Sequence, residues 1–284
     1  MIYLLLNSIA LDPHRWTAQK IPYFQIRDLL HPVAEAGFSM LEVWQYHVSR
    51  ESETVIRELR KLGDSLELSF PVVGFYPKLH LSGAERQQEL ELFDRITRYA
   101  KILGAKIIKI FAGIKGTDQL EETEYDRSLV FLAGMIDTAE KNGLLVTSEL
   151  HKKTLLDSLD AAQKLLRQIN SSNFKICFQP FDFRSTEKAV RDYLALAEQV
   201  PHVHYQGRHN GKMELLNNSD IDYAVLTRAL VEHGFEGYIS IEFVRDCVVE
   251  SPEQFDLQVV LANARCDKSY IGEVLCDNGV EYSG

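Results

Sequence analysis

Four polar residues stand where chemistry is expected, because three of them close a short apolar run that is typical of a buried strand and the fourth, a histidine, lies within another predicted strand. They are Glu149, Gln179, His204 and Glu242. Two carboxylates, an imidazole and an amide oxygen together suit a divalent cation of borderline to hard character, such as Mn²⁺, Mg²⁺, Co²⁺ or Zn²⁺. Glu149 and Glu242 are also candidate catalytic bases, since a carboxylate can take a proton from carbon beside a carbonyl group.

Other polar residues near the same strand ends are candidates for binding a substrate. They are His151, His202, Arg208, Lys109 and Arg184. His202 lies two positions before His204 and therefore on the same face of a strand. Lys109 stands inside an apolar run, where it either binds an anion or neutralises neighbouring carboxylates. The two arginines fit an anion clamp or an ordinary surface, and Glu42 is equally compatible with a functional role and a structural charge.

The segments that carry these residues alternate between amphipathic helices and short strands. A glycine just past a helix permits the left-handed conformation that ends it. This pattern precedes apolar runs at Gly37, Gly63, Gly104, Gly143 and Gly234. Three further strands are predicted at 1–6, 174–178 and 203–205, which makes about eight, the number that closes a (β/α)₈ barrel.

The predicted fold is therefore an α/β protein, a single-domain (β/α)₈ TIM barrel over residues 1–264. Polar residues at the strand ends converge on one face of such a barrel. The rival architecture is a doubly wound open sheet, which usually carries a glycine-rich loop after its first strand. Asn7-Ser8-Ile9-Ala10 follows here instead. Residues 265–284 lack a helical period and are predicted to form a C-terminal tail.

Composition excludes several classes of function. The formal net charge is −10 over 284 residues, so no nucleic-acid partner is expected. The four cysteines are far apart, which argues against a disulfide framework and a thiolate zinc site. No apolar run has the length of a membrane span, and Met1–Leu6 is too short for a signal peptide. We expect a cytoplasmic protein with no membrane partner.

The order and spacing of these segments resemble the xylose-isomerase-like sugar phosphate isomerase/epimerase superfamily over residues 1–264. The segments that carry the resemblance are Gly37–Glu42, Glu149–His151, His202–His204 and Ile239–Glu242. The resemblance implies that Glu149, Gln179, His204 and Glu242 are metal ligands. The superfamily has Asp where this chain has Gln179, so one negative charge is lost and the oxygen donor is weaker.

The resemblance further implies a divalent-metal-dependent isomerase or epimerase acting on a ketose or polyol. The metal would stabilise an enediolate while Glu149 and Glu242 move the proton. A dehydratase of the inosose type and a non-catalytic sugar-binding barrel with a degraded metal site are the alternatives. A related class, the metal-dependent apurinic endonuclease, is disfavoured by the acidic charge and by Gln179. The expected partner is a small sugar or polyol, and a second copy of the chain is another candidate.

Overall fold

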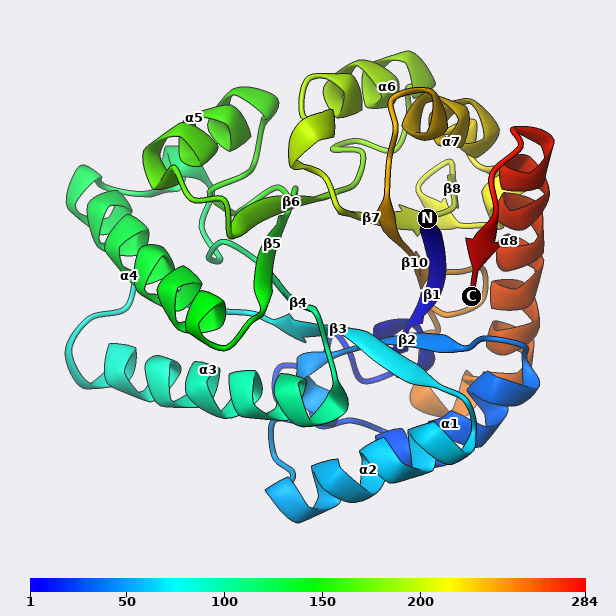
Figure 1. Ribbon diagram of the computed structural model, residues 1–284, viewed down its shortest axis with the longest axis horizontal. Helices are drawn as coiled ribbons and strands as arrows, with labels where there is room; N and C mark the ends of the chain where they lie inside the picture. The colour runs from blue at the N-terminus through cyan, green and yellow to red at the C-terminus, as the bar shows by residue number, and fades with distance from the viewer.

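The central strands form a closed parallel barrel, as the sequence predicts (Figure 1). The computed structural model describes residues 1–284. The strands pair in the order β10-β7-β6-β5-β4-β3-β2-β1, and β1 also pairs with β10, which closes the ring. They are β1 (Ile2–Asn7), β2 (Met40–Val43), β3 (Ser69–Phe75), β4 (Ile107–Ile110), β5 (Leu145–Glu149), β6 (Phe174–Phe178), β7 (His202–Gln206) and β10 (Gly237–Phe243).

The α-helices form an outer ring around the barrel (Figure 1). They are α1 (Ile26–Glu35), α2 (Glu53–Ser65), α3 (Gly83–Leu103), α4 (Glu122–Lys141), α5 (Leu159–Ile169), α6 (Thr186–Leu194), α7 (Tyr223–Glu232) and α8 (Leu257–Asp277). Two short strands, β8 (Arg208–His209) and β9 (Lys212–Met213), form an antiparallel pair in the loop after β7. None of the helices combines the length and apolar composition that a membrane span requires.

Four of the five glycines adopt the predicted left-handed conformation, with φ of 86° at Gly37 and 80°, 70° and 70° at Gly104, Gly143 and Gly234. Gly63 differs, because it lies inside α2 and packs against the ring of Phe70. The short apolar run that follows Gly63, residues 66–68, was predicted to be a strand, and this is wrong, since α2 continues to Ser65 and β3 begins at Ser69. The left-handed turn falls on Glu67, with φ of 56°.

The prediction of an irregular tail over residues 265–284 is also wrong. α8 continues to Asp277 and buries apolar side chains as far as Leu275. A short strand, β11 (Tyr282–Ser283), then pairs with the start of β1. This helix is difficult to recognise in the sequence because a buried acid, Asp267, interrupts its apolar stripe. Asp267 accepts a hydrogen bond from the backbone N–H of Leu216 at 2.8 Å.

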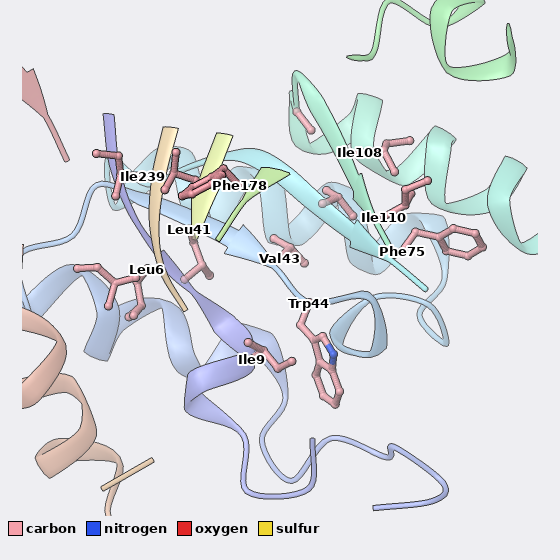
Figure 2. Packing of buried hydrophobic residues seen from close by; sticks show 14 of the residues in the cluster. Leu6, Ile9, Leu41, Val43, Trp44, Phe75, Ile108, Ile110, Phe178 and Ile239 are labelled. Carbon is pink, nitrogen blue, oxygen red and sulfur yellow. The ribbon is translucent and has the colours of Figure 1, made fainter. Parts of the chain in front are cut away.

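Most of the apolar core lies between the barrel wall and the helices, where the side chains of Leu41, Val43 and Phe75 pack (Figure 2). Side chains at alternate positions point to the inside of the barrel. There, a small apolar cluster of Leu5, Val72 and Ile107 is separate from the main core. The next inward positions along the strands carry polar residues. Buried polar groups need hydrogen-bond partners, so these residues must form a network.

Candidate active site

The inward-facing polar residues come from the C-terminal halves of five barrel strands. β5 contributes Glu149, β7 contributes His204 and β10 contributes Glu242. All three side chains are buried. Because parallel strands present their C-terminal ends at one rim, residues distant in sequence meet there. The convergence of these three residues was predicted from the sequence.

Glu149, His204 and Glu242 form a set of three converging metal-ligand types. One ligand atom from each lies within 4.8 Å of the other two. Nδ1 of His204 lies 3.3 Å from Oε1 of Glu242 and 3.6 Å from Oε2 of Glu149. This buried nitrogen has no hydrogen-bond partner. Two carboxylates facing an unpartnered imidazole nitrogen fit a divalent cation.

Glu42, at the end of β2, orients His204. Nε2 of His204 donates to the Glu42 carboxylate at 3.0 Å, which leaves Nδ1 directed at Glu149 and Glu242. Ser240 Oγ donates to the same carboxylate at 2.6 Å. Burial raises the pKa of Glu42, but His204 and His202 outweigh burial and hold that pKa well below its usual value. A carboxylate behind a histidine is the usual outer-shell partner in metal sites.

His204 carries a raised pKa in the absence of a cation. Burial lowers this pKa, but the acidic groups around the ring, Cys177 and Glu42 foremost, raise it well above the usual value. The electrostatic field that favours a proton on the ring equally favours a metal ion. A proton and a cation therefore compete for Nδ1.

Lys109, on β4, is an internal counter-ion. Its Nζ donates to Oε2 of Glu149 at 2.8 Å and lies 3.9 Å from Oε1 of Glu42. The rings of Tyr76 and Phe111 lie 4.9 Å and 5.0 Å from the ammonium group. Burial lowers the pKa of Lys109, yet the acidic groups around it, Glu149 foremost, together outweigh burial and raise it well above its usual value. Of the two alternatives for Lys109, the geometry matches neutralisation of neighbouring carboxylates.

Two glutamine side chains connect the two glutamates. Gln179 Nε2 donates to Oε1 of Glu149 at 2.7 Å. Gln206 Nε2 donates to Oε1 of Gln179 at 2.8 Å and to Oε2 of Glu242 at 3.0 Å. A carboxylate at position 179 would face Glu149 without a proton between them, whereas the amide donates. Gln179 is thus a hydrogen-bond donor to Glu149 here, and its role as a metal ligand stays a prediction.

Gln206 is a site residue that the sequence analysis missed. Its Oε1 accepts two hydrogen bonds from the guanidinium of Arg208, at 2.7 Å and 3.0 Å. Gln206 therefore links Arg208 to both glutamates. The signal that could have found it is the two-residue period of β7, which places Gln206 on the same face as His204.

The predicted substrate-binding residues lie at two depths. His202 and Lys109 are buried inside the barrel, where His202 Nε2 donates to Ser240 Oγ at 3.0 Å. His151, Arg184 and Arg208 instead line a cavity of about 260 Å³ at the rim. Gln179 lines the same cavity and contacts Glu149 behind it. The cavity thus opens from solvent toward the glutamates.

Comparison with known proteins assigns the chain to one family. The family model described as xylose isomerase-like TIM barrel matches residues 30–259. The chain belongs to this family. The matched range contains all the site residues described above.

Proteins similar to the chain differ in activity. The chain is 25% identical over 232 residues to a 3-dehydroshikimate dehydratase of Bacillus anthracis, covering 77% of the chain and 81% of that protein. A D-psicose 3-epimerase structure from Clostridium cellulolyticum H10 has a TM-score of 0.76 at 17% identity. The match covers 96% of this chain and 99% of the epimerase chain. A xylose isomerase-like TIM barrel protein from Mycobacterium smegmatis, in complex with magnesium, has a TM-score of 0.70 at 14% identity. The match covers 97% of this chain and 96% of that protein's chain. At these identities the structures show the fold alone.

Proposed function

We propose that this chain is a divalent-metal-dependent enzyme that moves a proton on the carbon beside a carbonyl group in a sugar or polyol. An isomerase or epimerase of ketoses is the first candidate. The observation that carries the proposal is the approach of both Glu149 and Glu242 to His204 Nδ1, at 3.6 Å and 3.3 Å. A bound Mn²⁺, Mg²⁺, Co²⁺ or Zn²⁺ would be held by Glu149, His204 and Glu242, with Gln179 a further candidate, and would supply Lewis acidity for an enediolate.

The two glutamates have different surroundings, which assigns them different tasks. Glu149 accepts hydrogen bonds from Lys109 and Gln179. Burial raises its pKa, but Lys109, His204 and His151 together outweigh burial and lower it, so the resting carboxylate is ionised. Glu242 accepts from Gln206 alone among side chains. Glu242 is therefore the carboxylate freer to take the proton, and Glu149, once it has itself taken a proton from solvent, would return one on the opposite face of the planar intermediate.

Position in the barrel supports a two-face mechanism. β5 and β10 are separated by β6 and β7 in the ring, so their terminal carboxylates approach a substrate from different sides. Inversion at a carbon needs one proton-transfer group on each face. Proton transfer along one face of the intermediate would instead give an aldose–ketose isomerase.

A dehydratase is the second candidate, and the similarity to the 3-dehydroshikimate dehydratase favours it. Such an enzyme takes the same proton with one carboxylate and then loses a hydroxyl group from the neighbouring carbon. The leaving hydroxyl requires a proton donor. His151, exposed at the cavity rim, is a candidate for that role.

Solvent exchange tests the proposal directly. The protein, loaded with Mn²⁺, is incubated in D₂O with a panel of ketoses, inososes and 3-dehydroshikimate. Deuterium beside the carbonyl together with a new epimer would identify an epimerase, and loss of water would identify a dehydratase. Mn²⁺ titration of wild type and of Glu149→Ala accompanies the assay. No exchange and no Mn²⁺ binding would overturn the proposal in favour of the non-catalytic sugar-binding barrel.

Arg208 is expected to bind the part of the substrate distant from the reacting carbon. Arg208→Gln should raise KM about tenfold, the equivalent of about 1.4 kcal/mol, with a smaller change in kcat. The reason is that the guanidinium lines the cavity but reaches the glutamates only through Gln206. Arg228→Gln, on the exposed side of α7, is the matched control. A drop in kcat at unchanged KM would contradict this role.

We also propose that the protein works in a reducing compartment such as the cytoplasm. All four cysteines are free, and two of them are buried. The exposed thiols of Cys266 and Cys276 would be open to oxidation in a secreted protein.

A further inference from the structure

A second group of metal-ligand types lies inside the barrel. Cys177, His202 and His204 are all buried, and one ligand atom from each lies within 4.8 Å of the other two. Cys177 is on β6 and the two histidines are on β7. The register of these strands pairs Cys177 with His202, so both side chains point into the barrel at the same level.

Both histidines present a free ring nitrogen. The Nε2 atoms of His202 and His204 lie 3.1 Å and 3.0 Å from the same oxygen of Glu42. His202 Nε2 also donates to Ser240 Oγ. With Nε2 held in this way, Nδ1 is the nitrogen left to bind another group. Nδ1 of His202 and Nδ1 of His204 are both buried without a nitrogen or oxygen partner, and the His202 ring lies within hydrogen-bond reach of the Cys177 thiol.

Unpartnered polar atoms at full burial are unfavourable, so two of them beside a thiol call for an explanation. In a tetrahedral zinc site, Zn–S is about 2.3 Å and Zn–N about 2.0–2.1 Å, which places the ligand atoms about 3.5 Å apart. The three ligand atoms here need to approach by little more than about 1 Å to reach that geometry. Side-chain rotation alone can supply such a shift.

We propose that Cys177, His202 and His204 form a second metal position, selective for thiophilic divalent cations such as Zn²⁺, Co²⁺ and Cd²⁺. The Cys177 thiol loses its proton to solvent and the sulfur forms a bond to the cation. Mg²⁺ and Mn²⁺ prefer oxygen ligands and would not occupy it. This position goes beyond the proposed catalytic function and contains neither of the two catalytic glutamates.

The two metal positions share His204 and therefore exclude one another. His204 has one free nitrogen, Nδ1, because Nε2 is bound to Glu42. A cation at Cys177 takes that nitrogen away from Glu149 and Glu242. Excess Zn²⁺ is thus expected to inhibit the enzyme by drawing His204 out of the carboxylate site, whereas excess Mn²⁺ is not.

Cobalt spectroscopy distinguishes the two positions. Co²⁺ bound to a thiolate gives an intense near-ultraviolet charge-transfer band, which Co²⁺ bound only to carboxylate and imidazole lacks. We expect the band on titrating Co²⁺ into the apoprotein, its loss in Cys177→Ser, and its retention in Cys247→Ser, the control at another buried cysteine. The band should also persist in the double variant Glu149→Gln/Glu242→Gln. Zn²⁺ should need a concentration at least about tenfold higher to inhibit Cys177→Ser, the loss that even an outer-shell change produces.

Cobalt binding without a charge-transfer band, or a band unchanged in Cys177→Ser, would overturn the proposal. If Cys177→Ser does not fold, X-ray absorption of wild-type protein loaded with Zn²⁺ decides instead. A sulfur neighbour at about 2.3 Å supports the proposal, and a shell of nitrogen and oxygen alone rejects it. Both readouts are independent of turnover, so failure of the proposed proton-transfer activity would leave this test intact.

Discussion

Glu242→Gln is expected to lower the rate of proton exchange by about 10²–10⁴-fold, the range for removal of a general base. The amide has nearly the shape of the carboxylate, and its oxygen can still accept the hydrogen bond from Gln206 Nε2. The fold should therefore be retained while the group that takes the proton is lost. The measurement is deuterium incorporation from D₂O in wild type and variant, at a metal concentration that saturates both.

Two controls separate a chemical effect from a structural one. Glu232→Gln changes an exposed glutamate at the end of α7 and should leave exchange unchanged. Thermal unfolding should show that Glu242→Gln stays within about 1 kcal/mol of wild type in stability. A variant that folds, binds metal and exchanges at the wild-type rate would remove Glu242 from the proposed mechanism.

Lys109→Met is expected to destabilise the protein by about 3–5 kcal/mol, the usual cost of removing one partner of a buried ion pair. Lys109 and Glu149 are both buried, and their charged atoms are 2.8 Å apart. Methionine fills a similar volume but leaves the Glu149 carboxylate without its counter-ion. The same change raises the pKa of Glu149, since Lys109 is what lowers it. Urea unfolding of metal-free protein at neutral pH measures the loss.

A double variant tests whether the lost charge pairing is the cause. Lys109→Met/Glu149→Gln should recover much of the lost stability, because the uncompensated carboxylate is gone. Lys106→Met, at an exposed position just before β4, is the matched control and should change stability by at most about 0.5 kcal/mol. Equal losses in the single and double variants would mean that packing around Tyr76 and Phe111 matters more than charge.

The charges around Lys109 also explain why position 179 carries an amide. Lys109 already neutralises Glu149, and Gln179 donates to the second oxygen of that carboxylate. The interior thus holds Glu42, Glu149 and Glu242 against one ammonium and the imidazoles of His202 and His204. A fourth carboxylate would add repulsion at the point where Gln179 and Glu149 are 2.7 Å apart.

Local sequence patterns were enough to predict the barrel and the convergence of three polar residues inside it. Alternating helices and apolar strands are local patterns, and parallel strands bring their C-terminal ends together whatever the details of packing. Glu149, His204 and Glu242 could therefore be predicted to converge. Predictions from local patterns were wrong at two positions where an unusual residue is buried inside a helix. Gly63 lies within α2 instead of ending it, and Asp267 is a buried acid within α8.

The hydrogen bonds and ion pairs among these residues could not be predicted from local patterns, because they join distant segments of the chain. Glu42 and His204 are 162 positions apart in sequence yet share a hydrogen bond. Lys109 reaches Glu149 across β4 and β5, and Cys177 lies level with His202. These contacts depend on the register of neighbouring strands, because a shift of one residue turns every side chain to the other face of the barrel wall. That register is set by closure of the whole barrel and is absent from any single segment.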